Sequence, residues 1–321
     1  MFQCESVAII VPERLGDTLF HTPSIRFLRK MRPDIRIEIV ALSALAASIF
    51  VNNPYIDAIH TTPDRYELKR IATRCQVVLN IHDHATSRQC AEAMGTPCIT
   101  AAPAQEVLHT AAHSQVFFEQ LLGAEMQPAE KRYALFPGDG EYACAERLLR
   151  AGGADPGRDI LIGCHIGCHS IAKKGWQFWR TPTHPKIWPL RNFTVLADML
   201  HGADPRFRLV LTGSVGEARM GRQLEQATPS VINLIGKTSV LELAALMGSL
   251  HLYVTPDTGA LHVACAADIG LVALFGPTSP AISGPYPKQP HHSVVQASRM
   301  EDIAPATVCA AILGHPSLKG P

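Results

Sequence analysis

The stretch "VTPDTGALHVACA", residues 254–266, combines an acid, a hydroxyl group and a glycine with a histidine one helical turn later. The triplet Asp257-Thr258-Gly259 also occurs in aspartic proteases. Those enzymes need two carboxylates that share a proton, normally from two such triplets in β-rich domains. This chain has one, within a pattern of alternating strands and helices. We therefore do not favour a protease.

The same triplet fits the start of a helix. Free backbone N–H groups and the helix dipole favour anionic oxygens at that position. Asp257 and Thr258 can cap the helix, Gly259 lets a ligand approach the backbone, and His262 projects one turn inside. The stretch therefore predicts a phosphate or diphosphate site. The alternative is that Asp257 only caps the helix and His262 is a core histidine.

Two neighbouring loops support the ligand site. The stretch "LVLTGSVGE", residues 209–217, ends a predicted strand with glycines and Glu217, and "ALFGPTSPAISGPY", residues 273–286, repeats the strand and glycine-proline loop. Loops at the carboxyl ends of parallel strands share one edge of a sheet. Together they would frame one nucleotide-sized crevice.

The elements that must position these residues alternate along the whole chain. An apolar run at residues 6–11 precedes the loop "PERLGDT" and a helical pattern, and further strands and helices follow. This predicts an α/β class of mostly parallel sheets covered on both faces. The pattern restarts after the glycine-rich segment near residues 152–159. We predict two doubly wound domains, residues 1–155 and 156–321.

Composition fits a globular protein without a membrane span. The 321 residues are 47% hydrophobic and 18% charged, and no apolar run approaches the length of a spanning helix. The start lacks a signal-peptide pattern, and the nine cysteines suit reduced, buried thiols. We therefore expect a cytoplasmic protein. The net charge of +1 gives no reason to expect nucleic acid as a partner.

Motifs from both halves of the chain occur in one order. They are "VAIIVPERLGDTLFHTPSIRFLRKMRPD", "KIWPLRNFTVLADML", "LTGSVGE", "GKTSVLELAAL", "VTPDTGALHVACA" and "LVALFGPTSP". Together they resemble glycosyltransferase family 9, the ADP-heptose-type lipopolysaccharide heptosyltransferases. The resemblance is loose between about residues 61 and 159.

The resemblance implies a GT-B fold, in which two Rossmann-like doubly wound domains face each other across a cleft. The first domain would bind the acceptor and the second the nucleotide sugar. The implied activity is inverting, metal-independent transfer of a heptose from ADP-heptose to the inner core of a lipid A-linked oligosaccharide. The enzyme would work peripherally at the cytoplasmic face of the inner membrane, with a substrate but no bound cofactor. No oligomeric state is implied.

The resemblance also implies two catalytic residues. Asp17 of "LGDT" would be the general base that accepts the proton of the acceptor hydroxyl, a role that needs a carboxylate within hydrogen-bond reach. Its alternative is an N-cap for the helix that follows. Lys186 of "KIWP" would neutralise the departing diphosphate.

By the same matching, the donor is bound in the C-terminal half. Thr258 and Gly259 would take the anion, and His262 would contact the sugar or diphosphate. Asp257 would face sugar hydroxyls or backbone N–H groups, because a carboxylate beside a phosphate is repelled. Glu217 would contact the ribose of the nucleotide.

A departure from the family pattern is the insertion "HSIAKKGWQFWRTPTHP", residues 169–185. Its basic and aromatic residues include Lys173, Lys174, Trp176 and Arg180. They would close over a diphosphate, contact an acidic acceptor glycolipid, or lie at a membrane interface. The alternative is a surface loop whose tryptophans pack on the domain. The two lysines also compete with the "KIWP" lysine as phosphate cations.

The run "CHIGCH" suggests a metal site made of Cys164, His165, Cys168 and His169. In an extended strand, however, the first two side chains point to opposite faces, and a second paired cluster is lacking. We therefore expect no bound metal.

Other functions fit parts of the pattern. A GT-B transferase with another nucleotide sugar or a protein acceptor shares the architecture, and so does a non-hydrolysing epimerase. A non-catalytic, sugar-nucleotide-binding protein of envelope assembly is a further alternative. It would have no need of the base at Asp17 or of the "KIWP" lysine.

Overall fold

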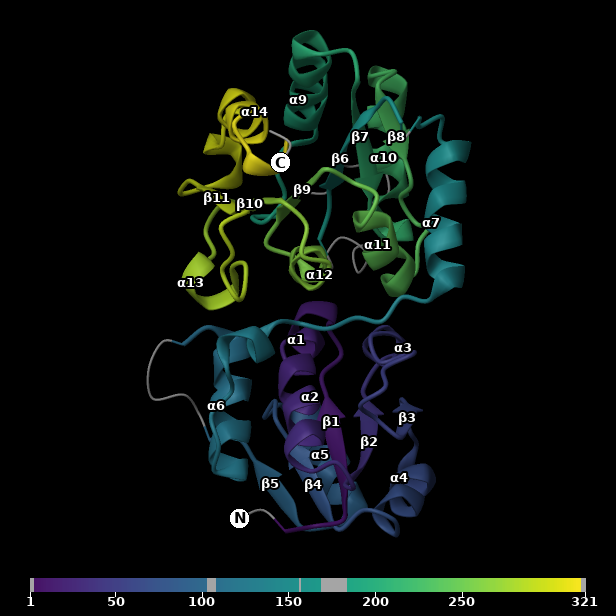
Figure 1. The fold of residues 1–321 in the computed structure, drawn as a ribbon, viewed down its shortest axis with the longest axis vertical. Helices are drawn as coiled ribbons and strands as arrows, with labels where there is room; N and C mark the ends of the chain where they lie inside the picture. Colours follow the sequence, from purple (N-terminus) through teal and green to yellow (C-terminus); the bar gives the residue numbers. More distant parts are fainter. Residues whose placement is uncertain (1–2, 103–107, 156, 169–183, 319–321) are drawn as a thin grey trace. The chain divides into compact units, whose positions relative to one another are not determined.

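The chain folds into two compact α/β units in the computed structural model, residues 1–136 and 137–321 (Figure 1). The structure describes residues 3–102, 108–155, 157–168 and 184–318. Within these ranges, no helix combines the length and the apolar character that crossing a membrane requires.

The first unit is built on a five-stranded parallel sheet with the order β3-β2-β1-β4-β5. All six residues of β1 are buried, as expected for the central strand of a sheet covered on both faces. The chain builds outward from β1 to β3 and then crosses to β4 on the other side. The strands are β1 (Ser6–Val11), β2 (Arg36–Ala41), β3 (Ala58–Thr61), β4 (Val77–Asn80) and β5 (Cys98–Thr100).

Helices connect these strands and bury their apolar faces. On one face of the sheet, Ile10 and Val78 pack with Ile71 of α4 and Met94 of α5. The α2 and α6 helices pack against each other. The helices are α1 (Leu15–Leu19), α2 (Thr22–Met31), α3 (Ala44–Ser48), α4 (Arg65–Ala72), α5 (Ala85–Met94), α6 (Thr110–Leu122) and the 3-10 turn η1 (Pro128–Lys131).

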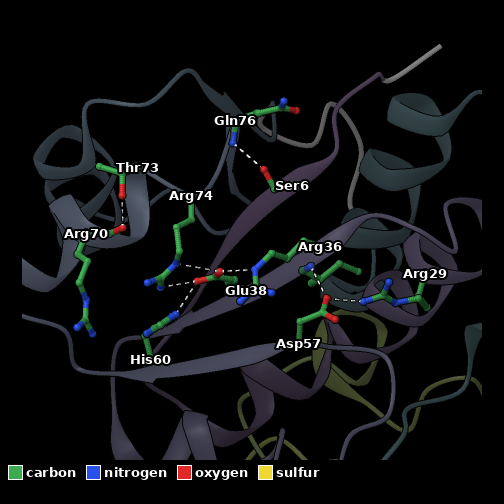
Figure 2. A network of polar contacts seen from close by, with 11 residues as sticks. Ser6, Arg29, Arg36, Glu38, Asp57, His60, Arg70, Thr73, Arg74 and Gln76 are labelled. Atoms are coloured by element: carbon green, nitrogen blue, oxygen red, sulfur yellow. Dashed lines mark hydrogen bonds and ion pairs between the residues drawn. The ribbon is translucent and has the colours of Figure 1, made fainter.

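A buried carboxylate joins β2 and β3 to the segment after α4 (Figure 2). The Glu38 side chain is fully buried, and it accepts hydrogen bonds from Arg36 at 2.7 Å and Arg74 at 3.1 Å. The His60 ring lies 2.7 Å from its second oxygen. Burial alone would raise the pKa of Glu38, but the hydrogen bonds from Arg74, Arg36 and His60 outweigh it and lower this pKa to about 2. The carboxylate is therefore ionised and paired inside the unit.

The second unit contains a six-stranded parallel sheet with the order β11-β10-β9-β6-β7-β8. Its chain also builds outward from the first strand, β6, and crosses from β8 to β9 on the opposite side of β6. Strand β11 at the edge was not predicted. The strands are β6 (Ile160–His165), β7 (Phe207–Thr212), β8 (Val231–Asn233), β9 (Leu252–Pro256), β10 (Leu271–Phe275) and β11 (His292–Gln296).

Helices of the second unit cover both faces of its sheet. Trp188 is completely buried with Phe193 of α9 and donates its indole N–H to the carbonyl oxygen of Ile303 at 2.9 Å. Trp188 is therefore a core residue of the second unit. The helices are α7 (Asp139–Ala151), α9 (Leu190–Ala203), α10 (Ala218–Ala227), α11 (Val240–Met247), α12 (Gly259–Ala266), α13 (Pro280–Ser283) and α14 (Pro305–Leu313), with the 3-10 turns η2 (Val215–Glu217), η3 (Met300–Asp302) and η4 (Pro316–Leu318).

The units divide between Phe136 and Pro137, earlier than the boundary between residues 155 and 156 that the sequence predicted. The difference is helix α7, which lies beside α11 of the second unit (Figure 1). Its inner face buries Ala145 and Leu149. Helix α7 therefore packs as part of the second unit, although it precedes that unit's first strand.

Candidate functional site

The N-terminus of α12 follows β9 directly, as the sequence predicted. Thr258 is the N-cap residue in an extended conformation, and its hydroxyl lies 3.2 Å from the Thr255 hydroxyl. No capping hydrogen bond of the Thr258 side chain is seen among the described residues. Gly259 is partly exposed in the first turn, while His262 is buried in the helix. The first turn of α12 therefore leaves its N–H groups to be satisfied by something other than this side chain.

Asp257 has a partner that the sequence did not predict. Its Oδ2 accepts a hydrogen bond from Lys186 Nζ at 2.7 Å. Only 6% of the Asp257 side chain is exposed, against 34% for Lys186. The carboxylate is thus the anionic partner of Lys186, whereas we expected it to face sugar hydroxyls or backbone N–H groups. The structure also brings two predicted site residues together that lie 71 positions apart.

Glu217 lies in η2, at the carboxyl end of β7, and is almost completely buried. Ser214 donates its hydroxyl to Glu217 Oε2 at 2.6 Å. Burial raises the pKa of Glu217, while the Ser214 hydrogen bonds act in the opposite direction. A Cβ atom at Gly167 would lie 2.2 Å from Glu217 Cγ, so only glycine allows this approach. The loop after β6 therefore holds the glutamate side chain in place.

The topology of the second unit gathers these residues. Strand β6 lies between β9 and β7, so the ends of all three strands meet at one edge. In doubly wound sheets, ligands bind at the point where the strand order reverses, here between β6 and β9. Asp257, Thr258 and Glu217 follow these neighbouring strands. Their positions fit one ligand site at this edge.

In the first unit, Asp17 lies in the first turn of α1, after β1, and is partly exposed. The N-cap of α1 is Arg14, so the alternative role of Asp17 as the cap is not observed. The corresponding reversal of strand order in this sheet lies between β1 and β4. Asp17 thus occupies the position at which an open α/β sheet binds its ligand.

Sequence reasoning missed the histidines around Asp17. Burial lowers the pKa of His82, which follows β4, whereas the negative charge of Asp17 raises it. The His82 ring contacts His84, with centroids 4.2 Å apart, and lies 6.2 Å from the His21 ring. His21 is buried and bonded to Ser114 at 2.9 Å, and burial lowers its pKa to about 3. His82 lies here because β1 and β4 are neighbours in the sheet. A sequence-based prediction of that strand order would have been needed to find it.

Comparisons with known proteins support this description. Residues 178–308 match the family model of glycosyltransferase family 9 (heptosyltransferase). The chain is 35% identical over 105 residues to lipooligosaccharide heptosyltransferase 2 of Haemophilus influenzae. The aligned residues make up 31% of this chain and 30% of the relative. The chain is a relative of the family 9 glycosyltransferases. It spans under a third of the length of the first curated relatives that it matches.

Solved structures extend the likeness over nearly the whole chain. A family 9 glycosyltransferase from Veillonella parvula has a TM-score of 0.80 at 20% identity and covers 97% of both chains. The ADP-heptose lipopolysaccharide heptosyltransferase II of Escherichia coli has a TM-score of 0.75 at 19% identity, and covers 96% of this chain and 97% of that chain. At such identities the likeness establishes the fold, so the two Rossmann-like units of the GT-B class are confirmed.

Some of the site residues that the sequence predicted lie outside the part of the chain that the structure describes. These are the insertion residues Lys173, Lys174, Trp176 and Arg180, together with His169 of the "CHIGCH" run. Within the described ranges, no group of three or more histidine, cysteine or acidic side chains is arranged to hold a metal ion. The second unit therefore has a candidate ligand site made of Lys186, Asp257, the start of α12 and Glu217. The first unit has its own candidate residue, Asp17.

Proposed function

We propose that this family 9 relative is an inverting glycosyltransferase that moves a heptose from ADP-heptose to the inner core of a lipopolysaccharide or lipooligosaccharide. The observation that carries the proposal is the pairing of Lys186 with Asp257 at the start of α12. It sets a cation beside a helix N-terminus at the carboxyl edge of the sheet. This arrangement suits a leaving diphosphate.

In the proposed reaction, Asp17 accepts the proton of an acceptor hydroxyl as its oxygen attacks the anomeric carbon. The new C–O bond forms as the bond from that carbon to the diphosphate breaks, with inversion of configuration. ADP departs with the electron pair of the broken bond. Its negative charge is stabilised by the N–H groups of α12 and by Lys186, so that the protein supplies the positive charge itself.

Lys186 and Asp257 would each change partner when the donor binds. A diphosphate attracts Lys186 more strongly than one carboxylate does, because it carries more negative charge. Asp257 would then turn to hydroxyls of the sugar, as the resemblance implied. Thr258 and Gly259 would approach the diphosphate, His262 would support this contact, and Glu217 would accept hydrogen bonds from the ribose.

The acceptor would be bound mainly by the first unit, which contains Asp17. We place the enzyme at the cytoplasmic face of the inner membrane, where a lipid A-linked acceptor would be presented to it. The E. coli relative bears ADP-heptose and lipopolysaccharide in its name. That agrees with the proposed donor and acceptor.

The decisive experiment supplies purified protein with ADP-heptose, with and without a lipooligosaccharide that lacks heptose. We expect release of ADP only when the acceptor is present, together with a mass increase of one heptose in the acceptor. Asp17→Asn should keep ADP binding and lose transfer by about 100-fold or more. ADP release without acceptor, or donor binding without any transfer, would contradict the proposal. Unchanged turnover in Asp17→Asn would refute the role of the base.

A further inference from the structure

His165 is the last residue of β6 and lies at the reversal of strand order in the second unit. In the register, it pairs with Thr212 at the end of β7. Side chains two positions apart share a face of a strand, so His165 lies on the same face as Gly163. A Cβ atom at Gly163 would touch the ring of Tyr253, which hydrogen-bonds to Thr212. These contacts identify the face of the sheet to which His165 belongs.

Residues on this face of the sheet also contact the start of α12. Thr255 lies two residues beyond Tyr253 on β9, and its hydroxyl contacts the hydroxyl of Thr258, the N-cap residue. The Cys164 and Val254 pair fixes the register of β6 and β9 one residue before this position. His165 therefore neighbours Thr255 and lies between the start of α12 and the loop that carries Glu217.

The two nitrogens of His165 have different surroundings. Nδ1 is buried and has no hydrogen-bond partner among the described residues, while the residue as a whole is partly exposed. Burial lowers the pKa of the ring to about 4, so the imidazole is neutral at pH 7. A buried N–H without a partner is rarer in proteins than a buried acceptor without one. The proton therefore belongs on Nε2, and the ring offers an uncharged N–H donor.

We propose that His165 is a further ligand-contacting residue of the donor site, and that its Nε2–H donates to the diphosphate of a nucleoside diphosphate. This inference rests on the proposed function, because that function places the diphosphate at the start of α12. The reversal of strand order supplies the position, and the Nε2–H group of the neutral ring supplies the donor.

A neutral donor has a distinct use at this position. Lys186 already provides positive charge, and Asp257 and Glu217 are carboxylates within the same edge of the sheet. An uncharged N–H can donate to a phosphate oxygen and forms no ion pair with either carboxylate. We therefore expect His165 to orient the diphosphate, while Lys186 responds to its charge.

The test measures ADP binding by calorimetry for the wild type and two variants of similar size. His165→Gln keeps an N–H group near the position of Nε2, and His165→Leu removes it. We expect affinity within about twofold of the wild type for His165→Gln and a loss of roughly tenfold for His165→Leu, as a hydrogen bond to a charged group implies. The exposed His201 on α9 provides the matched control, and His201→Gln should bind ADP like the wild type.

Nuclear magnetic resonance of the wild type gives a second measurement that a purely structural role would not affect. With histidine ring nitrogens labelled, ADP should shift the Nε2 signal of His165 and leave that of His201 unchanged. Equal ADP affinity in His165→Leu and the wild type, or an unshifted His165 signal with ADP bound, would overturn the inference. A wild type that binds no ADP would instead overturn the proposed function.

Discussion

Asp257 and Lys186 differ in burial, and this difference decides what each contributes at the scale of single residues. The carboxylate is nearly enclosed, whereas a third of the lysine side chain reaches water. Replacing Lys186 by Met leaves a buried charge without its partner. We expect a loss of about 1–3 kcal/mol in the free energy of unfolding of the second unit. Tryptophan fluorescence during urea unfolding follows this unit, because all three tryptophans lie in it.

Asp257→Asn is the matched variant. The asparagine side chain can still accept a hydrogen bond, and the released charge belongs to a partly exposed lysine that water can solvate. We expect the free energy of unfolding of the second unit to fall by less than about 1 kcal/mol. A greater loss for Asp257→Asn than for Lys186→Met would mean that the carboxylate stabilises the unit through contacts other than this pair.

The sequence predicted some of these residues and not others, for a physical reason. Asp17 and Asp257 each belong to a local pattern of strand, loop and helix, and such a pattern can be recognised from the sequence alone. The pairing of Asp257 with Lys186 joins residues 71 positions apart, and the effect of Asp17 on His82 acts between neighbouring strands. Such contacts depend on strand order and side-chain direction, and nothing in the local sequence encodes them.

At the scale of elements, the loop after β6 and the turn η2 fit together through Gly167 and Glu217. A methyl group at Gly167 would overlap the Glu217 side chain at Cγ, so that side chain would have to leave its position. Gly167→Ala should therefore destabilise the second unit by about 1–3 kcal/mol. It should also weaken ADP binding if Glu217 contacts the ribose. Urea unfolding and calorimetry of ADP binding measure the two effects.

A double variant separates this clash from a general effect on the loop. Glu217→Ala removes the atoms that the new methyl group would meet. Gly167→Ala should then cost much less stability in the Glu217→Ala background than in the wild type. Additive losses in the double variant would contradict the proposed contact.

The elements themselves were predicted where hydrophobic runs were long. The central strands β1, β6 and β9 are almost entirely buried, and each appeared as an apolar run. Strand β11 was missed because its sequence "HSVVQ" is short and partly exposed, as is common at the edge of a sheet. Helix α7 was assigned to the wrong unit, since an amphipathic pattern shows that a face is buried but not against which sheet.

At the scale of the whole molecule, Glu38 predicts how stability depends on pH. Its pKa falls from 4.5 to about 2 in the folded protein, so it contributes stability that is fully present above about pH 4.5. This contribution is lost as the pH falls from 4.5 towards 2. A shift of this size corresponds to about 3 kcal/mol. Scanning calorimetry at pH 7, 5, 4 and 3 should show the first unit losing stability in this range.

Glu38→Gln isolates the contribution of this carboxylate. The variant should be less stable than the wild type by a constant amount above about pH 5, and the difference should shrink below pH 4.5. The lowered pKa values of His21 and His165 also make the folded protein less stable in acid, but they do so equally in both proteins. A difference between the two proteins that stays constant down to pH 3 would show that the arginines do not hold the carboxylate ionised.

The division of the chain gives the last prediction at this scale. Helix α7 buries Ala145 and Leu149, and a hydrogen bond with Glu242 of α11 raises the pKa of the Cys144 thiol. At its end, Gly152 lies so close to Ile232 of β8 that a Cβ atom would overlap it. Residues 137–321 should therefore unfold cooperatively on their own and bind ADP.

Residues 156–321, the domain that the sequence predicted, would lack α7 and expose the apolar surface of α11 beneath it. We expect this shorter fragment to have a lower unfolding midpoint in urea and to aggregate at concentrations where residues 137–321 stay monomeric. Sedimentation velocity and tryptophan fluorescence compare the two fragments directly. Equal midpoints would mean that α7 is only attached to the second unit, and the boundary that the sequence predicted would then describe the folding unit better.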